Sequence, residues 1–301
     1  MKAPTLAQHV EPPADPGLEA TLARAIEPWL AHMTWRKDFD GWRERRIWQE
    51  RHQDANLKDV AQALDEKPAG KSLLDLGAGM GGLSVALLLA YRDRGLKLQA
   101  IDYNPDYCKI ASLRAARYGL ALPIAVGAGE HLPYPSASFD LITCLDVLEH
   151  VDDAEAVMLE MRRVLRPGGA VLTTVPNRRA FRDPHYHLPL INWLPRQVAE
   201  AIIKRAGRSK GGGPLQDRQE HSELNTYTWG EFSRLAWSMG FGLRDQVLWR
   251  IQEGEVRQLK GVRRAVLSIV QKIGLFTPLY RLYRYGWQGT YQIMLRKPIP
   301  R

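Results

Sequence analysis

Short apolar runs alternate with longer segments of helical periodicity through the middle of the chain. The apolar runs have the length of strands and lie at 72–77, 97–102, 123–127, 139–145 and 170–175. The helical patterns lie between them, at about 81–94, 105–118 and 152–165. Strands that alternate with helices form parallel sheets, because each crossover carries a helix onto one face of the sheet. The pattern therefore predicts an α/β fold with helices on both faces.

The residues before this region follow a different pattern. Residues 1–18 are rich in Pro, Ala and acidic residues and predict a disordered lead. Residues 19–66 have helical character, and tryptophans recur there at intervals of six or seven, at Trp29, Trp35, Trp42 and Trp48. We expect a helical cap at 19–66 whose tryptophans pack on a main domain at 67–301.

The regular alternation stops at residue 177. Residues 177–227 hold several prolines, a glycine run, aromatic residues and histidines. An insertion after the fifth strand lies at the carboxyl edge of a parallel sheet, where ligands bind, so we interpret 177–227 as a substrate lid. The fold then resumes with a helix at about 228–239 that stops at Gly240, a strand at about 242–250 and a final strand near 289–297.

A second insertion, at 255–288, is basic and amphipathic. One helical face carries Leu259, Val262, Val266, Ile269, Val270 and Ile273. A stretch of tyrosine, arginine and tryptophan follows at 280–287. Three interpretations are open. The segment packs on the domain with a solvated basic side, or it lies on an anionic membrane surface with its aromatic rings at headgroup depth, or it faces nucleic acid, which the continuous apolar face disfavours.

The net charge of +9 comes from this carboxyl-terminal part of the chain. Residues 256–301 hold ten Lys or Arg and no Asp or Glu, which leaves 32 basic and 33 acidic side chains in the other 255 residues. The concentration of charge in one segment predicts a local anionic partner rather than a generally cationic surface.

Cysteine use and the lack of long apolar runs bear on location. Two cysteines, Cys108 and Cys144, are too few for a disulfide framework, which is typical of a reducing cytoplasm. No run of about 18 apolar residues occurs, and the N-terminus lacks a charged-then-apolar signal pattern. We expect a cytoplasmic protein whose basic segment is its candidate contact with the inner face of a membrane.

A turn of small residues follows the first predicted strand. Glycines occur at 77, 79, 81 and 82, at the end of the strand predicted at 72–77 and before a helical pattern. Such a turn brings backbone amides and a helix N-terminus against a ligand, and only glycine permits so close an approach. Gly77, Gly79 and Gly82 also fit the dinucleotide pattern G-x-G-x-x-G, so the glycines alone do not identify the ligand. Asp75 favours a ligand with a cationic end.

Asp75-x-Gly77-x-Gly79-x-Gly81 resembles the first motif of the class I S-adenosyl-L-methionine (SAM) dependent methyltransferases. Three later segments are similar to the same family in the same order. They are 99–102, as a second strand that ends in an acid, 139–151, as a fourth strand and its turn, and 163–169, as the turn into a fifth strand. The resemblance is close over 70–176 and weak over 226–250. It implies a doubly wound, mostly parallel seven-stranded sheet whose last two strands are antiparallel, with the helical cap over the cofactor cleft.

The resemblance also implies SAM as the cofactor and a set of residues that hold it. Gly77 and Gly79 would let the backbone pass close to the methionine part, while Asp75 would order the loop or meet the amino group through water. Asp102 would accept the ribose hydroxyls. The other implied positions are Tyr103, Gly129 and Glu130 at the adenine end, and Cys144 and Leu145 beside the methionine part.

At the adenine end the sequence departs from the family. Members often carry an aspartate at the position of Ala128. Ala128 has no side chain that could recognise the adenine amino group, so we expect the backbone of Gly129 to form the hydrogen bond to the adenine ring. Glu130 either assists there or caps the loop.

The base that would deprotonate an acceptor is less clearly marked. A sulfonium methyl is already electrophilic, so the enzyme has mainly to align the nucleophile and remove its proton. Candidate bases lie near the fourth strand and in the lid, at His150, His185, His187 and His221. His185 and His187 also suggest a metal pair, but a third ligand at suitable spacing is missing, so we expect no metal.

We predict a SAM-dependent methyltransferase for a small or amphiphilic acceptor. Oxygen is favoured over nitrogen or carbon, because a histidine base suits a hydroxyl. One rival is an NAD-dependent oxidoreductase, based on Gly77, Gly79, Gly82 and Asp102. The other is a catalytically silent SAM-fold protein bound to a membrane. A nucleic-acid partner is disfavoured, because no Asn-Pro-Pro-Tyr/Phe motif follows the fourth strand.

Overall fold

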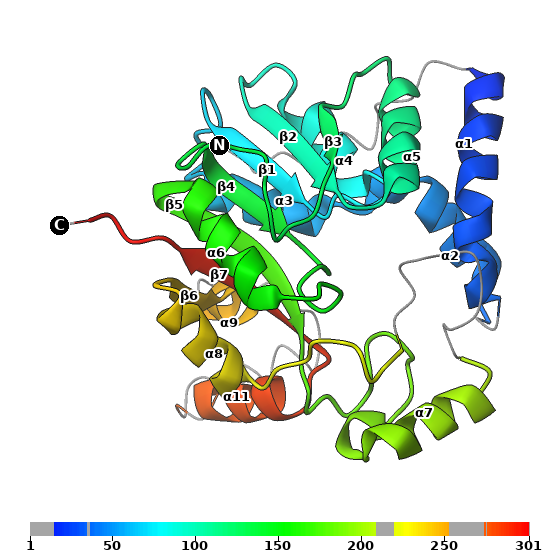
Figure 1. The fold of residues 1–301 in the computed structure, drawn as a ribbon, viewed down its shortest axis with the longest axis vertical. Helices are drawn as coiled ribbons and strands as arrows, with labels where there is room; N and C mark the ends of the chain where they lie inside the picture. Colours follow the sequence, from blue (N-terminus) through cyan, green and yellow to red (C-terminus); the bar gives the residue numbers. More distant parts are fainter. Residues whose placement is uncertain (1–14, 35–36, 209–219, 253–273, 275, 301) are drawn as a thin grey trace.

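The computed structural model describes residues 15–34, 37–208, 220–252, 274 and 276–300. Within them, one sheet has the strand order β3-β2-β1-β4-β5-β7-β6 (Figure 1). All neighbours are parallel except β7, which is antiparallel to both β5 and β6. The predicted seven-stranded sheet with an antiparallel final pair is confirmed. The strands are β1 Ser72–Leu76, β2 Lys97–Asp102, β3 Ile124–Val126, β4 Phe139–Cys144, β5 Leu165–Pro176, β6 Gly242–Asp245 and β7 Thr290–Arg296.

Helices cover both faces of this sheet, as the alternating pattern predicts. Neighbouring residues of one strand point to opposite faces, so Leu74 lies in a core with α6 and α8, and Leu73 in a core with α3, α4 and α5. Both side chains are fully buried. The helices are α3 Asp54–Ala63, α4 Gly82–Tyr91, α5 Pro105–Ala116, α6 Ala154–Val164 and α8 Trp229–Ser238.

The N-terminal region is helical, as expected, and packs against α5. It contains α1 Pro16–Leu30, η1 Ala31–Met33, α2 Phe39–Ile47 and η2 Gln49–His52 ahead of α3. Residues 16–18, which were expected to belong to the disordered lead, form the first turn of α1. The Asp15 carboxylate caps this helix by accepting hydrogen bonds from the backbone of Gly17 and Leu18. Trp29 packs on Tyr107 of α5, with ring centroids 4.5 Å apart. Trp35 lies outside the described residues.

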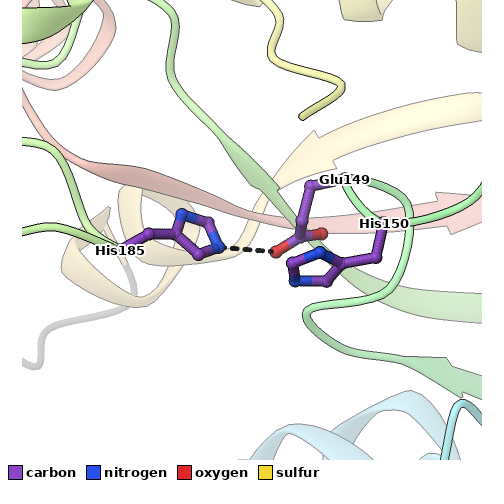
Figure 2. A group of neighbouring side chains, drawn as sticks. All are labelled: Glu149, His150 and His185. Atoms are coloured by element: carbon purple, nitrogen blue, oxygen red, sulfur yellow. Dashed lines mark ion pairs between the residues drawn. The ribbon is translucent and has the colours of Figure 1, made fainter. Parts of the chain in front are cut away.

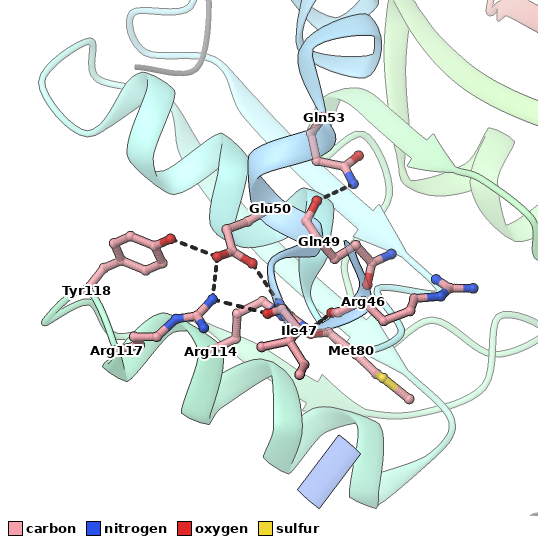
Figure 3. Close-up of polar contacts among 9 residues, drawn as sticks. All are labelled: Arg46, Ile47, Gln49, Glu50, Gln53, Met80, Arg114, Arg117 and Tyr118. Atoms are coloured by element: carbon pink, nitrogen blue, oxygen red, sulfur yellow. Dashed lines mark hydrogen bonds and ion pairs between the residues drawn. The ribbon is translucent and has the colours of Figure 1, made fainter. Parts of the chain in front are cut away.

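A buried ion-pair network joins η2 to α5 (Figure 3). The Glu50 carboxylate accepts hydrogen bonds from Arg114 Nη1 at 2.6 Å, from the Tyr118 hydroxyl at 2.7 Å and from Arg117. Glu50 and Arg114 are both fully buried. A single carboxylate therefore compensates two guanidinium groups that are removed from water.

The strand expected at 242–250 is half as long as predicted. It ends at Asp245, and α9 Gln246–Gln252 follows. The reason is a side-chain cap, since Asp245 Oδ1 accepts a hydrogen bond from the backbone of Leu248 at 2.9 Å. The same carboxylate faces the buried Arg284 of α11 (Phe276–Gly286), with Asp245 Oδ2 and Arg284 Nε 3.5 Å apart. Asp245 therefore ends the strand, starts the helix and neutralises a buried charge.

The first insertion has a small core of its own. Its described part contains η3 Ile191–Trp193 and α7 Arg196–Arg205, and α7 lies apart from the sheet in Figure 1. Its buried side chains are Tyr186, Ile191, Ala199, Ile203 and Leu224.

The second insertion is described only at its end, as α11 Phe276–Gly286. The apolar stripe from Leu259 to Ile273 lies outside the described residues. No helix in the described ranges is both long and apolar enough to cross a membrane.

Candidate active site

The glycine turn lies between β1 and α4, where the strand order of the sheet reverses. β1 has β2 on one side and β4 on the other, so the ends of these three parallel strands share one edge. Gly77, Gly79 and Gly81 all have positive φ, of 71°, 53° and 78°. A Cβ at Gly77 would lie 2.2 Å from Val147, whereas a Cβ at Gly79 would meet no atom within 4 Å. The turn is thus packed at Gly77 and open at Gly79, as a cradle for a ligand must be.

Asp75 points into the protein rather than toward this open side. Its carboxylate accepts hydrogen bonds from the hydroxyls of Ser84 at the start of α4 and Thr143 in β4. Burial raises the pKa of Asp75, against the opposing effect of these two hydrogen bonds. Of the two roles expected for it, ordering the turn is the one that this geometry supports.

Asp102, at the end of β2, faces the glycine turn. Its Oδ2 accepts a hydrogen bond from the backbone of Gly79 at 2.7 Å, and its Oδ1 accepts one from Asn104 at 2.9 Å. The carboxylate therefore lies directly beside the open glycine. The ring of Tyr103 is half exposed at the same edge. Asn104, which the sequence reasoning did not single out, starts α5 as its N-cap.

The other expected cofactor positions lie on the two neighbouring loops. Gly129 and Glu130 follow β3, and a Cβ at Gly129 would lie 3.3 Å from Val157. Cys144 ends β4 and is fully buried, and this burial raises the pKa of its thiol. Cys144 is therefore a small apolar wall rather than a nucleophile. The backbone then leaves the strand at Leu145, which is half-buried.

The N-terminal helices touch the glycine turn directly. A Cβ at Gly82 would lie 2.4 Å from the side chain of Gln49 in η2. Arg114 Nε donates to the carbonyl of Met80 in the turn at 2.8 Å, and Arg114 Nη1 donates to that of Ile47 at 2.6 Å (Figure 3). One buried arginine therefore links the turn to the cap.

Two of the four candidate histidines come together beyond β4. His150 and His185 lie edge to face, with ring centroids 5.5 Å apart, although they are 35 positions apart in the chain. Figure 2 shows the Glu149 carboxylate beside both rings, and His185 Nε2 is 3.8 Å from Glu149 Oε1. Glu149 is buried and the two histidines are half-buried. The first insertion thus brings a histidine to the edge at which β4 ends.

The other two histidines belong to the insertion itself. His221 Nε2 lies 2.9 Å from Asn192 Oδ1 and 3.8 Å from Asp183 Oδ2. His187 has a positive φ, and its carbonyl accepts hydrogen bonds from Arg182 and Arg208. These contacts of His187 and His221 all lie within the insertion.

The sequence reasoning missed Glu149 and Asn225. Glu149 was within reach, because an acid directly before His150 at a strand end is itself a signal for a site. Asn225 carries no such signal, since its role depends on the fold. Its side-chain nitrogen donates to the carbonyls of Leu148 and Val151 at 3.2 and 2.8 Å, and its backbone nitrogen donates to that of Glu149 at 3.0 Å. Asn225 thereby holds the loop that presents Glu149 and His150.

A family model described as "Methyltransferase domain" matches residues 74–173. The chain is 35% identical over 113 residues to a ubiquinone biosynthesis O-methyltransferase of Xanthomonas axonopodis pv. citri (strain 306). These residues are 37% of this chain and 46% of that protein. It is 34% identical over 172 residues to a probable S-adenosylmethionine-dependent methyltransferase of Mycolicibacterium smegmatis. These residues are 57% of this chain and 61% of that protein. The chain thus spans about half the length of the curated relatives it matches.

Among solved structures, the fold resembles that of a putative sarcosine dimethylglycine methyltransferase from Galdieria sulphuraria. The TM-score is 0.49 at 18% identity, over 82% of this chain and 86% of that one. The matched residues 74–173 hold the glycine turn, Asp102 and the His150 loop. Residues 74–173 therefore match a methyltransferase domain, and the sheet order described above is that of the class I methyltransferase fold, whose cofactor is S-adenosyl-L-methionine.

Proposed function

We propose that the protein transfers the methyl group of SAM to an oxygen of a small or amphiphilic acceptor. The observation that carries the proposal is the meeting of His150 and His185 beyond β4, next to the glycine turn. Val147 belongs to the same loop as His150 and packs against Gly77. The loop that carries His150 therefore contacts the glycine turn. A base at this place is suited to deprotonating a hydroxyl that faces the cofactor.

We assign to the cradle residues the roles that the resemblance to methyltransferases implies. The backbone at Gly77 and Gly79 passes close to the methionine part, and Asp75 orders this turn from behind. Asp102 accepts the ribose hydroxyls. The adenine end is lined by Tyr103, Gly129 and Glu130, and the methionine part lies beside Cys144 and Leu145. The open side of Gly79 and the adjacent carboxylate fit a ligand that combines a ribose with a cationic end.

When bound, SAM supplies an electrophilic methyl group on a sulfonium sulfur. The chain's own task is then to hold an acceptor hydroxyl in line with that methyl group and to remove its proton. His150 or His185 takes the proton on a ring nitrogen, and the buried Glu149 stabilises the resulting charge on His185, 3.8 Å away. His187 and His221 support the insertion rather than the reaction.

The acceptor class follows from the relatives and from the first insertion. The Xanthomonas relative is named for ubiquinone biosynthesis and for O-methylation, and it matches this chain over 113 residues. Aromatic rings of the insertion cluster with α11, where Phe181 stacks on Trp287 at 4.5 Å and Trp193 lies 5.7 Å from Trp287. We expect a hydroxylated aromatic acceptor. The oxidoreductase alternative has no support besides the glycine pattern and Asp102.

The test is methyl transfer from SAM to a panel of hydroxylated aromatic compounds, followed by mass spectrometry. We expect a methylated product from at least one hydroxyl acceptor. The variants His150→Gln and His185→Gln should lower kcat about 100-fold or more and leave SAM affinity unchanged. The exposed His52→Gln is the matched control. Methylation of amines alone, or unaltered rates in both histidine variants, would contradict the proposal.

We further propose that the protein is cytoplasmic and binds the surface of an anionic membrane. Apolar side chains are exposed at helical spacing on α7 and α11, and the exposed Trp193, just before α7, contacts the exposed Trp287, just after α11. Exposed basic residues flank the stripes at Arg196, Lys204, Arg205 and Arg281. An apolar stripe with basic flanks is typical of helices that lie in a membrane interface. The exposed apolar residues are Trp193, Leu194, Val198, Ile202, Leu279, Leu282, Tyr283 and Trp287.

Sedimentation with vesicles tests this attachment. The protein should pellet with vesicles that contain phosphatidylglycerol, remain in solution with pure phosphatidylcholine, and be released by high salt, because salt screens the basic residues. Leu282→Ser should weaken binding, whereas Ile299→Ser should not, although both side chains are 73% exposed. Failure to pellet at any salt concentration would exclude the attachment.

A further inference from the structure

Glu149, His150 and His185 also form a group that can hold a metal ion. One ligand atom from each lies within 4.8 Å of the others, and no other such group of at least three His, Cys, Asp or Glu occurs among the described residues. The three residues come from two segments, the loop after β4 and the start of the first insertion (Figure 2). The sequence expectation of no metal considered His185 with His187, whereas the fold gives His185 different neighbours.

The separation of the ligand atoms fits a shared ion better than a direct contact. His185 Nε2 and Glu149 Oε1 are 3.8 Å apart, which is too long for a hydrogen bond. Two atoms bound to one ion lie about 3–4 Å apart, because each metal–ligand bond measures about 2.0–2.2 Å.

Both segments are braced from outside the group, as metal ligands usually are. Asn225 fixes the carbonyls of Leu148, Glu149 and Val151. The Asp183 carboxylate accepts hydrogen bonds from the backbone of His185 at 2.8 Å and of Tyr186 at 2.7 Å. The side chains are therefore presented by backbone that is held at fixed points.

We infer that Glu149, His150 and His185 bind a divalent transition-metal ion that holds the acceptor, an inference that rests on the proposed methyl transfer. Two imidazoles and one carboxylate suit Zn²⁺, Mn²⁺ or Co²⁺ better than Mg²⁺, which prefers oxygen ligands. Three protein ligands leave neighbouring positions open on the ion. Those positions fit an acceptor with two adjacent oxygens, such as a vicinal diol of an aromatic ring.

The ion would make one acceptor hydroxyl more acidic, as it does for bound water. The hydroxyl proton leaves to solvent water and the anionic oxygen stays on the ion. That oxygen then forms the new bond to the methyl carbon, the carbon–sulfur bond breaks, and its electron pair remains on sulfur. No oxidant or reductant is required. In this form of the reaction His150 and His185 are ligands, and the metal replaces them as the activating group.

Calorimetry of Zn²⁺ and electron paramagnetic resonance of Mn²⁺, on protein stripped with a chelator, test the site without any acceptor. We expect one ion per chain. Glu149→Gln and His185→Gln should each weaken binding more than tenfold, and Asn225→Ala, which changes a positioning residue, about tenfold. His52→Gln should bind as the wild type does. Calorimetry of SAM on the same variants reports whether they fold, and the conservative Glu149→Asp should retain part of the metal affinity.

The outcomes separate this inference from the proposed function. No ion bound at millimolar concentration, or unchanged binding in His185→Gln, would overturn the site. A metal-binding protein that methylates no hydroxyl acceptor would keep the site and contradict the proposed function. Full methylation by the stripped protein would overturn the role of the ion. Support requires loss of the rate on stripping, recovery with Zn²⁺, Mn²⁺ or Co²⁺, and a preference for acceptors with two adjacent oxygens.

Discussion

Asp75 and Asp102 are both buried carboxylates at the ends of neighbouring strands, yet their surroundings assign them different tasks. The Asp75 carboxylate binds two hydroxyls within the protein, those of Ser84 and Thr143. The Asp102 carboxylate accepts hydrogen bonds from the backbone amides of Gly79 in the open glycine turn and of Asn104 at the start of α5. One residue therefore stabilises the cradle and the other faces its occupant.

Replacing Asp102 by alanine should weaken SAM binding by about 1–3 kcal/mol, because two ribose hydroxyls then lose their acceptor. Calorimetric titration with SAM and S-adenosylhomocysteine measures the loss. Asp106→Ala is the matched control, since Asp106 lies on the surface and pairs with Lys109. Equal affinities for the Asp102 variant and the wild type would exclude the ribose role.

Replacing Asp75 by asparagine should change how stability depends on pH. Burial raises the pKa of Asp75 above its ordinary value of 3.8, so the folded state holds the proton more tightly than the unfolded state. This tighter proton binding contributes its full stabilisation below the ordinary pKa of 3.8. The stabilisation is lost as the pH rises through the raised pKa of the folded state. Asparagine cannot ionise, so the variant should gain stability relative to the wild type as pH rises.

Urea unfolding of both proteins from pH 4 upward tests this prediction. The difference in free energy of unfolding should grow with pH and then level off above the raised pKa. Asp106→Asn, at an exposed site, should show no such trend. Parallel curves for Asp75→Asn and the wild type would mean that the carboxyl group titrates alike in both states.

At the scale of elements, the link between η2 and α5 determines how the N-terminal cap meets the main domain. Glu50 compensates Arg114 and Arg117, and Arg114 also bonds the glycine turn through Met80. Trp48 lies between Arg51 and Arg117, 3.7 and 3.8 Å from their guanidinium carbons. The described tryptophans of the cap, Trp29, Trp42 and Trp48, therefore pack against neighbouring side chains, and the connection to the glycine turn comes from Arg114.

Glu50→Gln should destabilise the protein by about 3–5 kcal/mol, because it leaves buried guanidinium groups without a counter-charge. Glu27→Gln, which breaks an exposed pair with Arg43, should cost less than about 1 kcal/mol. Urea unfolding measures both. Glu50→Gln should also weaken SAM binding, since Arg114 supports the turn. Similar costs for the two variants would show that the buried network contributes little.

At the scale of the whole molecule, the ends of β1, β2 and β4 meet the loops that carry the site. Cofactor binding should therefore stabilise the entire domain. At about 100 times its dissociation constant, SAM should add about 2.7 kcal/mol to the free energy of unfolding.

A thermal-shift assay with SAM, S-adenosylhomocysteine and NAD measures this effect. We expect the first two to raise the unfolding temperature and NAD to leave it unchanged. The result also tests the effect of Ala128, which stands where family members often carry an aspartate. Without that side chain we expect a lower affinity for SAM, but the glycine turn can still bind it. Stabilisation by NAD alone would favour the oxidoreductase alternative.

Sequence alone determined the sheet, its helices and the glycine turn, because strand and helix periods and glycine's access to positive φ are local properties. It also located the acid at residue 102. It failed at 242–250, where a single aspartate cap ended the strand and started α9. Local periodicity contains no information about that competition.

Only the tertiary structure decided which histidines belong together. His150 and His185 meet because Asn225 and Asp183 fix two distant backbones, and His221 is drawn instead to Asn192. The direction of Asp75 and the burial of Glu149 were decided in the same way. A side chain's partners depend on which loops the sheet edge brings together, and this is set by packing across the whole chain rather than by spacing along it.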